Sequence, residues 1–373
     1  MTEPGRPGPL TGIRVIDLSR LAPGPYASVL LADLGAEVIA VTGGRAGQVP
    51  AELSRGKRFV HLNLKLPASR AALHQLVATA DVVIEGFRPG VAARLGAGYD
   101  ELSQVNPRLV YCSVTGYDPG GPDAQAAGHD INYLAVTGLL GAVGPAGGPP
   151  APPLNVVADM AGGGMLAAFG ICAALVERDR SGRGQRIDAA MTDGVLSMME
   201  MWFSAWRTPL LPERGLGFTT GAAPFYRCYR CADGRYVAVG AVEDGFFRAL
   251  WDGLGLPLPY PEERFDPAAW PELARVIGER FATAGRDEWA ARFAGADACV
   301  TPVLDPGEAL AAAGRPGPVP RFSRTPGARS PEAGQPDATA QLLAEAGLSE
   351  EDRRAVAEEG RQDGAFGLKW PPG

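Results

Sequence analysis

The amino-acid sequence predicts an α/β protein, with a large domain built around a largely parallel, doubly wound sheet and a smaller α+β domain after it. Three observations support this prediction. Short apolar runs alternate with helical stretches from residue 13 to residue 116, a rhythm that implies right-handed strand-helix-strand crossovers. A nearly all-apolar stretch follows at residues 159–178. Near residue 225 the pattern changes to a hairpin followed by amphipathic helices.

In the large domain, strands are expected at the short apolar runs and helices at the longer stretches between them. The expected strands cover residues 13–18, 37–41, 58–64, 81–86 and 108–116, and the expected helices include 25–36 and 69–80. The first strand is followed by APGPYAS and not by G-x-G-x-x-G. The sequence therefore does not support a dinucleotide-binding fingerprint.

The stretch at residues 159–178, DMAGGGMLAAFGICAALVER, is apolar nearly all round, which predicts a buried helix. Farther along, a hairpin is expected to turn at Asp233 and Gly234, with helices after it at 244–254, 269–284 and 286–294. The expected organisation is a large domain (1–190), a linker (191–224), a small α+β domain (225–312), a Pro- and Gly-rich linker (313–335) and C-terminal helices that return to the large domain (336–373).

Composition excludes several classes of function. The formal net charge is -7 and the basic residues are scattered, which disfavours nucleic acid or an anionic membrane as a partner. The N-terminus lacks a signal-peptide pattern and no apolar run approaches the roughly 20 residues of a membrane span, so a cytoplasmic location is expected. Five cysteines make a disulfide framework improbable. Cys228 and Cys231 form a C-x-x-C, but without a second ligand pair they indicate strand residues before a turn and no metal site.

An anionic ligand would need a local basic cluster. The sequence offers Arg55, Lys57 and Arg58 in SRGKR, and Arg88 in GFRPGV. From charge alone, a solvated face is the better interpretation of both stretches.

Three acid or base side chains stand in glycine-rich or apolar surroundings, where a pKa can be tuned. His129 lies in GHDINYLAVTG, Asp159 opens the expected buried helix, and Glu243 follows the hairpin. Each has an ordinary alternative: a histidine bonded to a carbonyl, an N-cap aspartate, and an acid at a helix N-terminus. Three consecutive glycines at 162–164, shortly after Asp159, each weaken a helix by about 1 kcal/mol, so they need a reason such as the close approach of a ligand.

Taken together, these stretches resemble the class III coenzyme A transferase superfamily, and specifically its α-methylacyl-CoA racemase branch. The resemblance covers nearly the whole chain. It is carried in order by LTGIRVIDLSRLAPGPYASVLLADLGAEVI, RGKR, LNLK, DVVIEGFRPGVAARLG, GHDINYLAVTG, PPLNVVADMAGGGM, SGRGQRIDAAMTDG, YRCADGRYVAVGAVE and DACVTPVLD. The transferases usually have Gly-Tyr-Asp where this chain has Gly-His-Asp, and the histidine favours the racemase branch.

The resemblance implies a fold, a reaction and a set of residues. His129 and Asp159 would transfer protons on opposite faces of the carbon next to a thioester, through an enolate held by backbone N–H near Asp159, and Glu243 would orient His129. The resemblance also implies a Rossmann-like large domain in an interlocked homodimer, in which the partner chain could supply Glu243. Acyl-coenzyme A is the expected substrate, with no prosthetic group and no metal. The expected coenzyme contacts are Arg45, Lys65, Phe87, Arg88, Arg94, Asp130 and Tyr133.

Two departures from the family pattern bear on coenzyme binding. Gly43 stands where relatives carry an arginine that contacts the coenzyme A phosphates, and Arg45 is the expected substitute. The connection at residues 305–320 is also shorter than the corresponding segment of relatives. Two alternatives to racemisation therefore stay open: a coenzyme A transferase that uses Asp159 as its nucleophile, and a repurposed member that acts on another acyl carrier or substrate.

Overall fold

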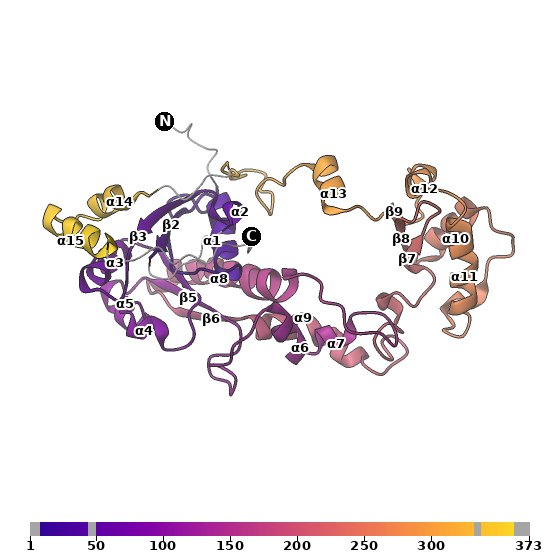
Figure 1. The fold of residues 1–373 in the computed structure, drawn as a ribbon, viewed down its shortest axis with the longest axis horizontal. Coiled ribbons are helices and arrows are strands. Elements are labelled where there is room, and N and C mark those ends of the chain that lie inside the picture. Colours follow the sequence, from indigo (N-terminus) through magenta and orange to yellow (C-terminus); the bar gives the residue numbers. More distant parts are fainter. Residues whose placement is uncertain (1–7, 44–49, 332–336, 362–373) are drawn as a thin grey trace. The chain divides into compact units, whose positions relative to one another are not determined.

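The computed structural model describes residues 8–43, 50–331 and 337–361, and the chain divides into two compact units (Figure 1). The first unit comprises Met1–Thr137, Pro153–Ser197 and Pro316–Gly373, and the second comprises Gly138–Pro152 and Met198–Arg315. The first unit holds a six-stranded parallel sheet and the second a separate three-stranded antiparallel sheet. The predicted α/β fold class is confirmed.

The sheet of the first unit has the strand order β3-β2-β1-β4-β5-β6, and all neighbouring strands are parallel. Its strands are β1 (Arg14–Asp17), β2 (Glu37–Thr42), β3 (Lys57–His61), β4 (Val82–Glu85), β5 (Val110–Thr115) and β6 (Arg186–Ala190). The order reverses between β1 and β4. In open α/β sheets the ligand crevice lies at such a reversal, beyond the carboxyl ends of the strands.

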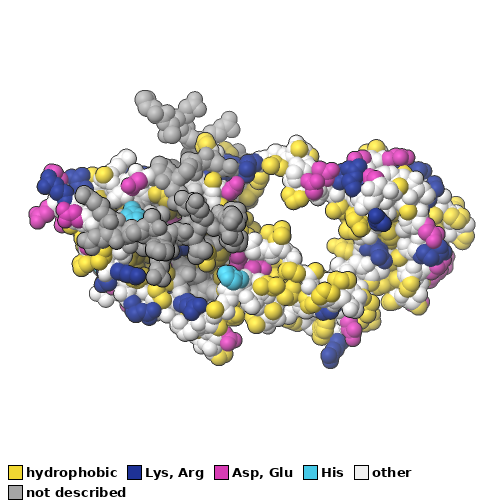
Figure 2. Space-filling view, in the orientation of Figure 1, with side chains coloured by type: hydrophobic (Ala, Val, Ile, Leu, Met, Phe, Trp, Pro, Cys, Tyr) yellow, Lys and Arg dark blue, Asp and Glu magenta, His cyan; other side chains and the backbone are white. Residues whose placement is uncertain are grey.

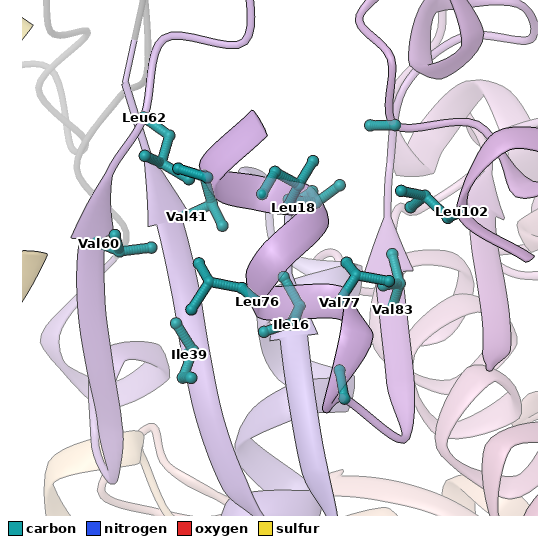
Figure 3. Close-up of a cluster of buried hydrophobic side chains, with 14 of the residues drawn as sticks. Ile16, Leu18, Ile39, Val41, Val60, Leu62, Leu76, Val77, Val83 and Leu102 are labelled. Atoms are coloured by element: carbon teal, nitrogen blue, oxygen red, sulfur yellow. The ribbon is translucent and has the colours of Figure 1, made fainter. Parts of the chain in front are cut away.

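Helices cover both faces of this sheet because its strands are apolar on both sides. Ile16, Ile39 and Val83 point to one face, where α3 (Pro67–Ala78), α5 (Tyr99–Val105), α14 (Thr339–Glu345) and α15 (Glu350–Arg361) contribute to the core, part of which Figure 3 shows. Val15 and Val38 point to the other face, which α1 (Pro23–Asp33) and α8 (Leu166–Ser181) cover. The described residues of this unit also form the helices α2 (Ala51–Ser54), α4 (Val91–Arg94) and α6 (Asp130–Val136).

The expected apolar helix is present but is not buried all round. It begins as the π-helix η1 (Val156–Met165) and continues as α8, with Ala167, Ile171 and Ala174 packed in the core. Phe169 and Val176 are 72% and 62% exposed, so one apolar side of α8 faces outward. By length and composition alone the segment Val156–Ser181 also passes as a membrane span, against the sequence expectation, although a core helix of a soluble protein passes the same test.

The glycines at 162–164 allow neighbouring helices to approach η1. A Cβ on Gly163 would lie 2.8 Å from the Met191 side chain, and one on Gly164 would lie 2.7 Å from the Tyr26 ring. Met191 begins α9 (Met191–Ala205), which takes up much of the segment expected as a linker, and Tyr26 belongs to α1. Helix packing, and not the close approach of a ligand, accounts for these glycines.

Gly194 of α9 lies against the Gly162 carbonyl, and a Cβ there would clash with that oxygen. Gly194→Ala is expected to destabilise the protein by about 1–3 kcal/mol, because two packed backbones would have to separate. Chemical denaturation measures this change. Gly141→Ala is the matched control, because a Cβ at Gly141 meets nothing within 4 Å. Equal stability of the two variants would show that α9 and η1 are not packed in this way.

The second unit is built on an antiparallel sheet of three strands, β7 (Tyr226–Arg230), β8 (Tyr236–Gly240) and β9 (Val300–Pro302). Gly234 has φ +80° in the predicted hairpin turn. The helices are α7 (Leu139–Ala142), α10 (Asp244–Leu254), α11 (Trp270–Phe281), α12 (Arg286–Phe293) and α13 (Pro306–Ala313). Cys228 lies in β7 and Cys231 just after it, as predicted. Within the three described stretches of chain, no group of three or more His, Cys, Asp or Glu is placed to hold a metal ion.

Candidate functional site

The carboxyl ends of β1 and β4 carry two arginines suited to an anionic ligand, together with one aromatic side chain. Phe87 and Arg88 follow β4, and Arg20 follows β1. The Arg20 guanidinium carbon lies 5.8 Å from the centre of the Phe87 ring. Two of the residues expected to contact the coenzyme therefore stand at the point where the strand order reverses, which is the usual ligand crevice of such sheets.

A buried carboxylate fixes the loop that follows β4. Glu85 ends this strand and is 4% exposed, and its Oε2 accepts the Phe87 N–H at 2.7 Å. The Ser113 hydroxyl of β5 donates to its other oxygen. Burial raises the pKa of Glu85, and the hydrogen bonds from Ser113 and Phe87 act in the opposite direction. The backbone of Phe87 is thus held in place by Glu85 of β4, which is itself bonded to Ser113 of β5.

The basic cluster SRGKR is neither a free anion site nor a solvated face. Arg55 is 7% exposed and bonds Asp33, and Lys57 is 8% exposed, with Nζ 3.2 Å from Asp17 Oδ2. Arg58 pairs with Glu37 and with Glu345 of α14. All three cations are engaged within the first unit. Their partners could not be recognised in the sequence, because each partner is at least 21 residues away in the chain.

The other expected coenzyme contacts are placed as follows. Lys65 lies just beyond β3 and is exposed, and Arg94 is an exposed residue at the end of α4. Arg45 lies outside the described residues. Gly43 directly follows β2 with φ +144°, and a Cβ there would clash with the Leu62 carbonyl. The loop as it stands therefore requires glycine at this position.

His129 occupies the N-cap position of α6, and its side chain is exposed. The backbone N–H of His129 donates to Asn132 Oδ1 at 3.1 Å, and the backbone carbonyl of His129 accepts from the Asn132 backbone N–H at 2.8 Å. These reciprocal bonds fix the backbone from which the imidazole projects. An exposed imidazole on a fixed backbone is available for proton transfer with a ligand.

Asp130 connects the His129 turn to the start of η1. Its side chain is 6% exposed, and Oδ2 accepts the N–H groups of Ala158 and Asp159, both at 2.9 Å. These bonds hold the start of η1, which carries Asp159, against the turn that carries His129. The Asp159 N–H is therefore engaged by Asp130 and does not hold an enolate oxygen. The Met160 N–H, the other donor expected from the sequence, stays a prediction.

The Asp159 carboxyl is half-buried, and desolvation by burial raises its pKa. The charge of Asp130 also raises the pKa, whereas the hydrogen bond from Asn155 and the charge of His129 lower it. Asn155 Nδ2 donates to Asp159 Oδ2 at 3.1 Å. A carboxyl with a raised pKa is a better proton donor near neutral pH than an ordinary aspartate. The site thus pairs an exposed imidazole with a tuned carboxyl.

Asp159→Asn is expected to raise the melting temperature at about pH 8 and to leave it unchanged below about pH 4. A folded-state pKa above the unfolded value means that the protonated form contributes stability, which is lost as the pH rises through the folded pKa. Asparagine keeps the Asn155 hydrogen bond and removes the buried charge. Melting curves across this pH range measure the difference, and a variant less stable than the parent at about pH 8 would contradict the account.

Tyr133 is buried and shapes the turn before His129. Its hydroxyl donates to the Gly128 carbonyl at 2.7 Å, and its ring packs edge-on against Tyr117. Burial raises the pKa of Tyr133 to about 12, while the charge of Arg88 lowers it. A Cβ on Gly128 would lie 2.6 Å from the Tyr133 ring, so glycine is required there. Asp130 and Tyr133 were expected as coenzyme contacts, and both side chains bond the chain itself.

Glu243 belongs to the second unit. It takes the N-cap position of α10 and its side chain is exposed. Across the described residues of α10 its side chain makes no capping hydrogen bond, so the alternative of a capping acid does not account for it. Of the three predicted catalytic residues, His129 and Asp159 lie together in the first unit.

Three residues at this site were missed from the sequence. Arg20 had one usable signal, because it is a basic residue just beyond the first strand of a parallel sheet. Asn155 stands four residues before Asp159, a spacing at which side chains meet on a helix. Asn132 stands three residues after His129, the spacing of a reciprocal cap.

Comparison with known proteins identifies relatives along most of the chain. The model of CoA-transferase family III matches residues 10–314. The chain is 40% identical to the alpha-methylacyl-CoA racemase of Mus musculus, over 92% of this chain and 94% of the mouse protein. It is 43% identical to the alpha-methylacyl-CoA racemase of Homo sapiens, over 79% of this chain and 78% of the human protein. A solved CAIB/BAIF family protein from Brucella suis superimposes with a TM-score of 0.77 at 28% identity, over 91% of this chain and all of that one.

Proposed function

The chain belongs to CoA-transferase family III, and on that premise we propose that it is an α-methylacyl-CoA racemase. It inverts the carbon that carries the methyl group beside the thioester of a 2-methylacyl-CoA. The observation that carries this proposal is the pairing of an exposed His129 with a half-buried Asp159 whose pKa is raised.

The reaction is a 1,1-proton transfer between two groups. In one direction neutral His129 removes the α-proton while protonated Asp159 delivers a proton to the opposite face, and in the other direction the roles are exchanged. The intermediate is an enolate. Each group must be a weak acid near neutral pH, and burial moves the pKa of Asp159 toward that range. Glu243 is the proposed positioning residue for His129, from this chain or from a partner chain.

The coenzyme part of the substrate is proposed to bind at the carboxyl edge of the parallel sheet. Phe87 and Arg88 flank the strand reversal, and the exposed Lys65 and Arg94 add positive charge. Arg45 is proposed as a further contact. No prosthetic group is required, because the thioester itself makes the α-proton acidic enough for bases of this kind.

We also propose a homodimer, supported by exposed apolar side chains. Phe169 and Val176 of α8 are 72% and 62% exposed, and Val136 of α6 is 63% exposed. In α9, Met201 is 62% exposed, and Figure 2 shows hydrophobic side chains on the surface around α6 and α9. Exposed apolar side chains of this kind are typical of an interaction site. A monomer in sedimentation equilibrium would contradict this proposal.

Incubating a single epimer of a 2-methylacyl-CoA in heavy water tests the proposed reaction. The expected result is deuterium at the α-carbon together with loss of optical purity. Absence of exchange with several acyl chains would contradict it. The transferase alternative predicts instead an acyl or coenzyme A adduct on Asp159, detectable after hydroxylamine treatment, and indifference to His129→Ala.

A further inference from the structure

We infer that Arg20 binds a phosphate group of the coenzyme and is a main charged contact of this chain to the nucleotide part of its substrate. This inference rests on the proposed function only in taking an acyl-coenzyme A as the ligand. It adds to the coenzyme contacts suggested by the sequence a residue that the family resemblance did not indicate.

Arg20 lies where the strand order reverses. It is exposed, it follows β1 by three residues, and its side chain contacts the loops after both neighbouring strands. Nη2 donates to the Gly43 carbonyl beyond β2 at 3.1 Å, and the guanidinium lies over the Phe87 ring beyond β4. One cation is thus held at the carboxyl ends of three adjacent strands, where open α/β sheets bind their ligands.

The loop after β2 explains why the cation comes from β1. Gly43 has φ +144° and a Cβ there would clash with the Leu62 carbonyl, so no basic side chain can start from this position in the loop as it stands. Arg20 brings a guanidinium to the same place from the neighbouring strand. A planar guanidinium matches phosphate oxygens in a bidentate way that a lysine does not.

The position of this guanidinium is fixed by its surroundings. The ring on which it lies belongs to Phe87, whose N–H is held by the buried Glu85 carboxylate. The loop that carries Arg20 begins at Ser19, whose N–H donates to Asp17 Oδ1 at 2.9 Å, and Asp17 is itself paired with Lys57. A cation fixed in this way loses less side-chain freedom when a ligand binds.

Calorimetric titration of the full-length protein with coenzyme A tests the inference. Arg20→Met is expected to weaken coenzyme A binding by about tenfold to a hundredfold, the range of a lost charged hydrogen bond. Binding of pantetheine, which lacks the nucleotide phosphates, is expected to be equal in both proteins. Titration with dephospho-coenzyme A, which lacks the 3′-phosphate, shows which phosphate Arg20 binds. If Arg20→Met still binds this ligand more weakly than the parent does, Arg20 contacts the diphosphate. If the two proteins bind it equally, Arg20 contacts the 3′-phosphate.

Arg183→Met is the matched control. Arg183 is exposed and lies between α8 and β6, at the amino end of β6, whereas Arg20 lies beyond the carboxyl end of β1. Arg183→Met should bind coenzyme A as the parent does. Arg20→Lys should recover part of the affinity, since it keeps the charge and loses the planar fork. Equal coenzyme A affinity of Arg20→Met and the parent, or an equal loss with pantetheine, would overturn the inference. A parent that binds coenzyme A through Arg20 without racemising thioesters would overturn the proposed function alone.

Discussion

His129→Gln and Asp159→Asn are each expected to lower kcat for racemisation by about 10²- to 10⁴-fold, the contribution of a positioned general acid or base. Either change leaves one face of the α-carbon without a group to donate or accept a proton. Coenzyme affinity should change little, because the proposed coenzyme contacts Lys65, Phe87, Arg88 and Arg94 lie on other elements than His129 and Asp159. Polarimetry or chiral separation of the thioester over time measures the effect.

His74→Gln is the control for the histidine variant. His74 lies in α3, where Nε2 is 2.8 Å from the Gly96 carbonyl, and it has no place in the proposed reaction. Its kcat should match that of the parent. If His129→Gln kept parental kcat, His129 would be only a helix N-cap residue.

Lys57→Met is expected to destabilise the protein by about 3–5 kcal/mol, because it leaves a buried carboxylate without its cation. Asp17 is 1% exposed, and its charge is compensated by Lys57 and by the hydroxyls of Ser19 and Ser28. These bonds join β1 to β3 and to the loop that precedes Arg20. Denaturant unfolding, followed by circular dichroism, measures the loss.

Arg275→Met is the matched control and removes two exposed ion pairs. Arg275 bonds Glu272 and Glu279 on the surface of α11, where such pairs contribute about 0–1 kcal/mol. A similar small loss in Lys57→Met would show that the contact between Lys57 and Asp17 is not a buried ion pair.

The fold could be predicted because its strands are apolar on both faces. Runs such as Ile13–Leu18 have few alternatives to a covered parallel strand. The outward side of α8 could not be predicted, because Phe169 and Val176 have the composition of core residues and only the fold shows that this chain leaves them exposed. The π-helical start of the same segment gives no sequence signal of its own.

The candidate site could be predicted only as separate residues. Motif resemblance singled out His129 and Asp159, but the contact that brings them together runs through Asp130, which bonds backbone groups 28 and 29 residues later. Arg20 reaches Gly43 and Phe87 only because β1 lies between β2 and β4 in the sheet. Long-range hydrogen bonds and strand order therefore set the geometry that local patterns do not contain.

The most direct test of the two-sided proton transfer is deuterium exchange with each epimer of a 2-methylacyl-CoA, measured separately in Asp159→Asn and His129→Gln. We expect each variant to exchange the α-proton of one epimer without inverting it, and the two variants to act on opposite epimers, since each keeps the group on one face. Exchange of the same epimer by both variants, or full racemisation by either, would contradict an imidazole and a carboxyl on opposite sides of one carbon.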